Sequence, residues 1–129
     1  MNTELHFLGL SIALGLVHIL ASAHAKNWHY GYQWSAGARD EPPGKPGVLA
    51  GRLERALQNF GETFPLFAAA VIATQLAERQ DWLTALGAQL YVWGRVVYLP
   101  LYASGVPLMR SFAWNVATLG IVLVAVRLL

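Results

Sequence analysis

A stripe of polar residues at helical spacing interrupts an otherwise apolar stretch, and it consists of Arg52, Arg55, Asn59 and Glu62. At about 100° per residue, these side chains lie within roughly 80° of one another on a helix. A carboxylate inside a membrane costs about 2.5–3.5 kcal/mol on the insertion scale, so an intramembrane Glu62 is expected to be paired and functional. The stripe therefore predicts a polar site that faces a partner helix or a water-filled cavity.

A second polar stripe follows further along the chain. It places Tyr91, Arg95, Tyr98 and Tyr102 within roughly 60° of one another on a helix. The next helix is expected to open with Arg110-Ser111, directly after Gly105-Val106-Pro107. In the membrane orientation that the loops indicate, both groups lie on the same side as the first stripe. Three helices are therefore predicted to meet in one polar layer.

The charges of this layer indicate the chemistry of its ligand. Arginines outnumber the carboxylate, since Glu62 is accompanied by Arg52, Arg55, Arg95 and Arg110. Guanidinium groups suit carboxylates, which they bind in a bidentate fashion. One carboxylate among them suits an ammonium group, and tyrosine hydroxyls can donate to an anion. The residues therefore predict a small zwitterion with an excess of carboxylates, which enters from the cytoplasm.

The composition and four apolar segments indicate the elements that position these residues. Hydrophobic residues make up 56% of the 129-residue chain and charged residues only 12%. Each segment is close to the roughly 20 residues that cross a bilayer, and the segments run over about 5–25, 56–77, 82–103 and 108–128. The sequence therefore predicts a single domain, 1–129, that is an all-α integral membrane protein with four transmembrane helices. Pro65 and Pro100 are expected to kink two of them.

Composition also excludes some classes of function. The chain has no cysteine, so disulfides and cysteine-bound metals are excluded. Its four histidines show no metal-ligand spacing, and no metal site is predicted. The net charge of +2 is too small to suggest nucleic-acid binding.

The loops predict the orientation in the membrane. The loop over about 26–55 carries several cations, the loop at 78–81 is balanced or slightly acidic, and the third loop carries Arg110. Because cytoplasmic loops collect Lys and Arg, the first and third loops are placed in the cytoplasm. The first loop also holds aromatic residues suited to the headgroup layer, Trp28, Tyr30, Tyr32 and Trp34.

The first apolar segment can be interpreted either as a signal peptide or as a retained helix. Segment 5–25 could be a signal peptide, because Ala21-Ser22-Ala23 resembles a cleavage site. Its first residues contain Glu4 and no Lys or Arg, which favours a retained helix. Within that helix, His18 is expected to form a hydrogen bond inside the bundle, and Lys26 at its end could add a cation to the site.

Other polar residues also admit a second interpretation. Glu62 could form only a structural ion pair with Arg55 or Arg95. Ser111 could cap its helix after Pro107 instead of taking part in chemistry. The tryptophans of the later segments are expected to pack or to lie at an interface, and they are Trp82, Trp93 and Trp114.

The polar residues together resemble the MAPEG family, the membrane-associated proteins in eicosanoid and glutathione metabolism. The match consists of Arg52-x-x-Arg55-Ala56-x-x-Asn59-x-x-Glu62-x-x-Pro65-x-Phe67, Gly94-Arg95-x-x-Tyr98-x-x-x-Tyr102 and Pro107-x-x-Arg110-Ser111. These motifs follow in the right order over three predicted helices, so the resemblance covers most of the chain. Within the family, residues 59–67 are most similar to the leukotriene C synthase branch, residues 110–111 to the microsomal prostaglandin E synthase branch and residues 37–43 to a bacterial branch.

The resemblance implies a left-handed four-helix bundle assembled as a homotrimer, with glutathione bound between neighbouring subunits. It implies that Glu62 lies near the γ-glutamyl ammonium and that Arg95 supports the site from below. The implied glutathione-binding set comprises Arg52, Arg55, Asn59, Glu62, Arg95, Tyr98 and Tyr102. Similarity to the bacterial branch implies a bacterial inner membrane, with the site facing the cytoplasm.

The resemblance also implies thiol activation by Arg110, with Ser111 as a hydrogen-bond donor to the sulfur. A thiol with a pKa of about 8.5 is only a few per cent ionised at neutral pH, and a nearby cation lowers that pKa. The thiolate would conjugate a lipophilic electrophile dissolved in the membrane lipid or reduce a lipid hydroperoxide, as a glutathione transferase or peroxidase. Two departures from the family pattern are Thr63, where an aromatic residue is expected, and the length of the segment between Tyr102 and Arg110.

Two other functions remain open. A family member without catalysis could act as a scaffold that binds a lipid or a partner protein, although a scaffold has no need for all the residues of the polar layer. A small transporter subunit is a third interpretation, since intramembrane charges allow it. The chain shows no inverted repeats, which does not favour transport.

Overall fold

The computed structural model describes residues 2–40, 44–45 and 47–129, and within these ranges it is helical and contains no strand. The helices are α1 (Thr3–Tyr30), α2 (Tyr32–Ala36), α3 (Val48–Leu76), α4 (Trp82–Ala103) and α5 (Pro107–Ala125), and a 3-10 turn, η1 (Val126–Leu128), follows α5. The predicted all-α fold class is confirmed. Part of the loop predicted over about 26–55, namely residues 41–43 and 46, lies outside the described residues.

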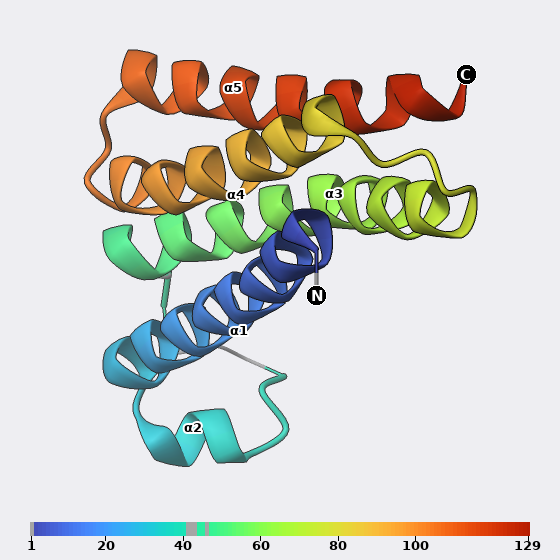
Figure 1. The fold of residues 1–129 in the computed structure, drawn as a ribbon. Coiled ribbons are helices and arrows are strands. Elements are labelled where there is room, and N and C mark those ends of the chain that lie inside the picture. Colours follow the sequence, from blue (N-terminus) through green and yellow to red (C-terminus); the bar gives the residue numbers. More distant parts are fainter. Residues whose placement is uncertain (1, 41–43, 46) are drawn as a thin grey trace.

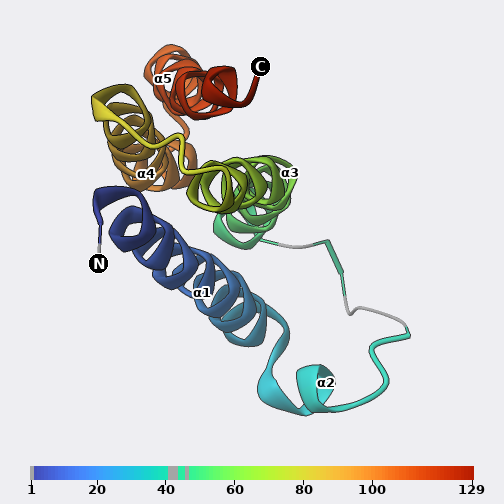
Figure 2. The same ribbon diagram turned by 45° about the vertical axis from the view of Figure 1, so that its right-hand side comes forward.

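Four long helices form the body of the molecule. α3, α4 and α5 run alongside one another, and each of the three packs against the other two (Figures 1 and 2). α1 packs obliquely against α3 and α4, and its C-terminal part turns away from α4 and leads into α2 (Figure 2). At the opposite end, the N-cap residue Asn2 donates a hydrogen bond to Gln75 and so ties the start of α1 to the end of α3.

The helices extend beyond two of the predicted spans. α1 continues to Tyr30, and α3 begins at Val48, eight residues before its predicted span at Ala56. The loop predicted over 26–55 is correspondingly shorter, so Arg52 and Arg55 lie on helix rather than in a loop. Nothing in residues 48–55 breaks a helix except Gly51, which is tolerated there, and no proline interrupts the segment.

Two of the described helices are long and apolar enough to cross a membrane. They are α1 and the continuous stretch Pro107–Leu128 formed by α5 and η1. Spanning by α3 and α4 remains a prediction. Pro65 lies inside α3 and Pro100 inside α4, as expected.

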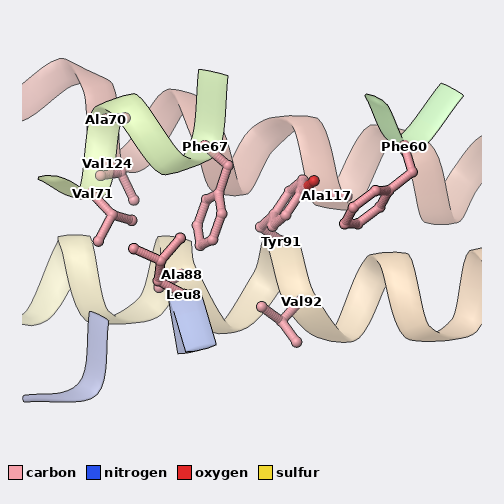
Figure 3. Packing of buried hydrophobic residues seen from close by; sticks show 10 residues of the cluster. All are labelled: Leu8, Phe60, Phe67, Ala70, Val71, Ala88, Tyr91, Val92, Ala117 and Val124. Carbon is pink, nitrogen blue, oxygen red and sulfur yellow. The ribbon is translucent and has the colours of Figure 1, made fainter. Parts of the chain in front are cut away.

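Small residues allow α4 and α5 to pack backbone against backbone. A Cβ atom added to Gly87 would lie 2.6 Å from the carbonyl oxygen of Gly120, and one added to Gly94 would lie 3.0 Å from Ala117. Close approach through small residues is a common way to join helices in membranes. α3 adds larger side chains to this core, where Phe67 stacks on Tyr91 with ring centroids 4.1 Å apart (Figure 3).

The end of the molecule opposite α2 is closed by a capped helix start. Asp81 caps α4 by accepting from the backbone N–H groups of Leu83 and Thr84, and it pairs with Arg127 at 2.6 Å. Desolvation alone would raise the pKa of Asp81, but these hydrogen bonds and the guanidinium outweigh it and hold the pKa below its usual value. The carboxylate therefore stays ionised and joins the start of α4 to the chain's C-terminal turn.

Candidate functional site

A cavity of about 400 Å³ opens where α3, α4 and α5 meet. Residues of both predicted stripes line it together with the start of α5, and they are Asn59, Tyr98, Tyr102, Arg110, Ser111, Trp114 and Asn115. The three helices predicted to share a polar layer therefore do place polar side chains around one space. Among the described residues, its lining contains a guanidinium and no carboxylate, so its charge suits an anion.

Arg95 lies beneath this cavity and is completely buried. Its Nη1 donates to Oδ1 of Asn59 at 2.6 Å, and its Cζ lies 4.0 Å from the ring centroid of Tyr98. The Nε and Nη2 atoms of Arg95 have no hydrogen-bond partner among the described residues. The buried guanidinium of Arg95 can therefore hold the side chains of Asn59 and Tyr98 in place, and two of its nitrogens remain available as donors.

Tyr102 connects the two cations at the edge of the cavity. The Cζ of Arg110 lies 4.7 Å from its ring centroid, and Nε of Arg55 donates to its hydroxyl at 3.2 Å. The rings of Tyr98 and Tyr102 are 5.5 Å apart and tilted. The aromatic pair thus links the buried Arg95 to the half-buried Arg110, and it holds the Arg110 guanidinium against the cavity wall without neutralising it.

Ser111 does not cap α5. The N-cap is Val106, with no side-chain cap, and the Ser111 hydroxyl donates to the carbonyl oxygen of Pro107 at 3.2 Å. The interpretation of Ser111 as a helix cap is therefore wrong, because the serine lies one turn inside the helix. Its hydroxyl lines the cavity together with Arg110.

The cavity lining also includes two residues that were not predicted as site residues. Trp114 was expected to pack or to lie at an interface; it does pack against the buried cluster of Ala56, Tyr98 and Ala113, and it also lines the cavity, where its buried indole Nε1 has no partner among the described residues. Asn115 lines the same wall and donates to the carbonyl oxygen of Ser111 at 2.8 Å. The signal was present in the helical spacing, since Trp114 and Asn115 follow Arg110 and Ser111 by four residues.

Other residues of the predicted set lie outside the cavity lining. Arg52 donates to the carbonyl oxygen of Ala103 at 3.2 Å and so ties α3 to the end of α4. Glu62 is exposed, and within the described part of the chain no ion pair joins it to Arg55 or Arg95. The interpretation of Glu62 as a structural ion pair is therefore wrong for this chain. Glu62 is also not among the residues that line the cavity.

The two candidate residues of α1 also differ from expectation. His18 is 1% exposed and stacks on Phe60, and neither of its ring nitrogens has a hydrogen-bond partner among the described residues. The predicted hydrogen bond of His18 within the bundle is therefore wrong. Lys26 pairs with Glu54 at 2.7 Å and lines a different cavity, so it adds no cation to the space beside Arg110.

The hydrogen bond between Asn59 and Arg95 gives a testable expectation for stability. Asn59→Ala removes the acceptor at 2.6 Å and leaves a donor of a buried guanidinium unpaired. We expect this change to lower the free energy of unfolding by about 2 kcal/mol, measured in mixed micelles. Asn115→Ala is the control, since Asn115 is exposed and bonds only within its own helix. Equal stability of the two variants would contradict the role of Asn59 as the partner of Arg95.

Comparison with known proteins identifies the family. The family model described as MAPEG family matches residues 7–129, essentially the whole chain. Searches of curated proteins and of solved structures gave no match. The assignment to particular branches of the family therefore stays a prediction, whereas the family's membrane association agrees with the two apolar helices. The polar motifs of α3, α4 and α5 and this match lead to one conclusion: the chain is a membrane protein that belongs to the MAPEG family.

Proposed function

We propose that this protein is a glutathione-dependent membrane enzyme that activates the glutathione thiol. The observation that carries the proposal is the cavity lined by Arg110, Ser111 and Asn59, where a guanidinium faces open space and no carboxylate lines the wall. Glutathione carries two carboxylates, an ammonium and a thiol, so it meets the requirement for an anionic zwitterion. Family membership is consistent with a glutathione-related membrane function.

In the proposed arrangement, Arg110 stabilises the thiolate and Ser111 donates a hydrogen bond to the sulfur. To donate, the hydroxyl must turn away from the carbonyl oxygen of Pro107, to which it is bonded at 3.2 Å. The thiolate then forms a sulfur–carbon bond with a lipophilic electrophile, whose leaving group departs with the bond electrons. With a lipid hydroperoxide, the sulfur attacks the terminal oxygen and an alcohol is released, and a second glutathione then completes the disulfide and releases water.

We propose further that four helices span the membrane and that three copies of the chain share the glutathione sites. The exposed Glu62, with no partner among the described residues, supports this arrangement, because an intramembrane carboxylate is costly unless something pairs with it. A neighbouring subunit together with the ligand ammonium would supply that partner. The distribution of Lys and Arg in the loops supports a site that faces the cytoplasm, and the resemblance of residues 37–43 to a bacterial branch supports the bacterial inner membrane as the location.

Glutathione binding and turnover test the proposal directly. The purified protein in detergent is expected to bind glutathione saturably and to conjugate a generic electrophile such as a chlorodinitrobenzene. Binding without conjugation or peroxide reduction would favour the non-catalytic scaffold of the same family. The absence of both binding and turnover would overturn the proposal.

Glu62 provides a sharper test of how the ligand is held. Glu62→Gln is expected to weaken glutathione binding by about tenfold to a hundredfold, because a charge-assisted bond to the ammonium is lost. Stability of the single subunit should not change, since no described residue bonds to the carboxylate. Isothermal titration measures the affinity, and Glu78→Gln, at an exposed position beyond the end of the same helix, is the control. Unchanged affinity in Glu62→Gln would remove Glu62 from the site.

A further inference from the structure

A second cavity, of about 490 Å³, lies between the C-terminal part of α1, α2 and α3. It shares no lining residue with the cavity beside Arg110. Figure 2 shows α2 at the far end of α1, away from α4 and α5. The proposed glutathione chemistry makes no use of this space, so its lining must be explained separately.

One wall of this cavity is polar and carries more cations than anions. Among the described residues, Lys26 and Arg39 line it with one carboxylate, Glu54, which is already paired with Lys26 at 2.7 Å. Nε of Arg39 donates to the carbonyl oxygen of Ser35 at 2.7 Å, which holds the guanidinium stem at the end of α2. The local balance therefore favours an anion over a cation.

A buried hydroxyl in the same wall points to a polar ligand. Ser35 is 8% exposed and lines the cavity, and its Oγ has no hydrogen-bond partner among the described residues. A buried hydroxyl without a partner is costly in a folded protein. A ligand oxygen in the cavity would satisfy it.

The opposite wall is apolar and continues onto an exposed apolar surface of α1. Ile19, Ala23 and Leu57 line the cavity. Ile19 is itself 52% exposed, and its neighbours Leu16 and Leu20 are 56% and 57% exposed on a helix apolar enough to cross a membrane. An alkyl chain can therefore lie along α1 while its head enters the cavity.

The aromatic residues place this cavity at the headgroup level. Tyr30 and Trp34 line it, and Trp28 beside them is 88% exposed. Exposed tryptophan and tyrosine at the end of an apolar helix are typical of the membrane–water interface. A cavity at this depth lies where lipid headgroups and the polar ends of other amphiphiles are found.

We propose that this cavity binds the head of an anionic amphiphile, a molecule with one alkyl or acyl chain and a phosphate or carboxylate head. The head lies between Lys26, Arg39 and the Ser35 hydroxyl, and the chain follows the exposed face of α1. This site goes beyond the proposed glutathione function and does not depend on it. Binding requires both the negatively charged head and the alkyl chain. A free anion lacks the chain, and a neutral lipid lacks the charge.

Photolabelling of the full-length protein tests the site. The protein is placed in nanodiscs of phosphatidylcholine without glutathione, and dodecyl phosphate with a diazirine in its chain is the probe. We expect saturable labelling of the peptides that carry Ile19 and Leu57. Leu57→Trp fills the apolar wall and is expected to abolish saturable labelling, whereas Leu66→Trp, at a 62% exposed position on the same helix, should label like the unchanged protein.

Two more variants keep the test independent of folding defects. Ala23→Leu fills the cavity from α1 at an exposed position and should also abolish saturable labelling. Arg39→Gln should lower the affinity for the probe about three- to fivefold, the range of a partly exposed ion pair. Arg79→Gln, at the other end of the molecule, is its control.

Competition by inorganic phosphate at the same concentration as dodecyl phosphate, or equal labelling by a neutral dodecanol probe, would overturn the proposal. Unchanged labelling of Ala23→Leu and Leu57→Trp would also overturn it.

Discussion

Arg110→Ala is expected to retain glutathione binding and to lose the ultraviolet absorbance of the bound thiolate, with a fall in conjugation rate of about 10²- to 10³-fold. The guanidinium lies in the cavity lining, 4.7 Å from the ring centroid of Tyr102, and within the described part of the chain no carboxylate pairs with it. A nearby cation lowers the pKa of a thiol, so its removal returns the bound sulfur to the protonated form. Difference spectroscopy of the glutathione complex and stopped-flow conjugation measure the two effects.

The controls for this change separate charge from packing. Arg110→Lys keeps the cation and should recover part of the thiolate signal, although a lysine does not reproduce the stacked geometry on Tyr102. Arg79→Ala removes an exposed arginine at the other end of the molecule and should behave like the unchanged protein. An equal thiolate signal in Arg110→Ala and in the unchanged protein would remove Arg110 from this role. The proposed glutathione site itself would then rest on the binding measurements alone.

Gly120→Ala is expected to cause the largest loss of stability, about 3 kcal/mol, because no space exists for a methyl group between α4 and α5. A Cβ atom at Gly120 would overlap the carbonyl oxygen of Gly87 and would lie 2.6 Å from the backbone nitrogen of Tyr91. Both of these atoms belong to helix backbone, so the two helices must move apart. The displacement would also separate Arg110 from Tyr102 across the cavity. Reversible unfolding in mixed micelles measures the change.

Gly9→Ala is the matched control for this prediction. Both glycines lie inside helices, so both changes gain about the same helix propensity, up to roughly 1 kcal/mol. A Cβ atom at Gly9 meets nothing within 4 Å. We therefore expect Gly9→Ala to be neutral or slightly stabilising. If Gly120→Ala proved equally stable, the close contact of α4 and α5 would be contradicted.

Helical spacing correctly predicts the site residues wherever that spacing alone determines which side chains share a face. Asn59 on α3, Tyr98 and Tyr102 on α4, and Arg110 and Ser111 on α5 were predicted to lie in one layer, and the structure brings them around one cavity. Two properties of a single segment were sufficient to predict this polar layer. They are the rotation per residue in a helix and the free-energy cost of a polar group in a membrane.

Helical spacing does not predict the contacts of a side chain that depend on what its helix packs against. His18 was expected to find a hydrogen bond, but Phe60 of α3 covers its ring. Lys26 was a candidate cation for the site, but the C-terminal part of α1 turns away from α4 and carries Lys26 to the cavity between α1, α2 and α3, where it pairs with Glu54. Trp114 packs as expected, but it also lines the cavity, which was not predicted. None of these neighbours can be deduced from periodicity.

The sequence by itself determined the all-α class, the family and the faces on which polar residues gather, because composition and helical periodicity are properties of single segments. Only the tertiary structure decided which faces meet. It enclosed Arg95 beneath Asn59 and Tyr98, left Glu62 exposed and opened a second cavity under α2. These outcomes follow from how closely the helices approach and cross, which in turn depends on contacts such as Gly87 with Gly120 between residues far apart in the chain.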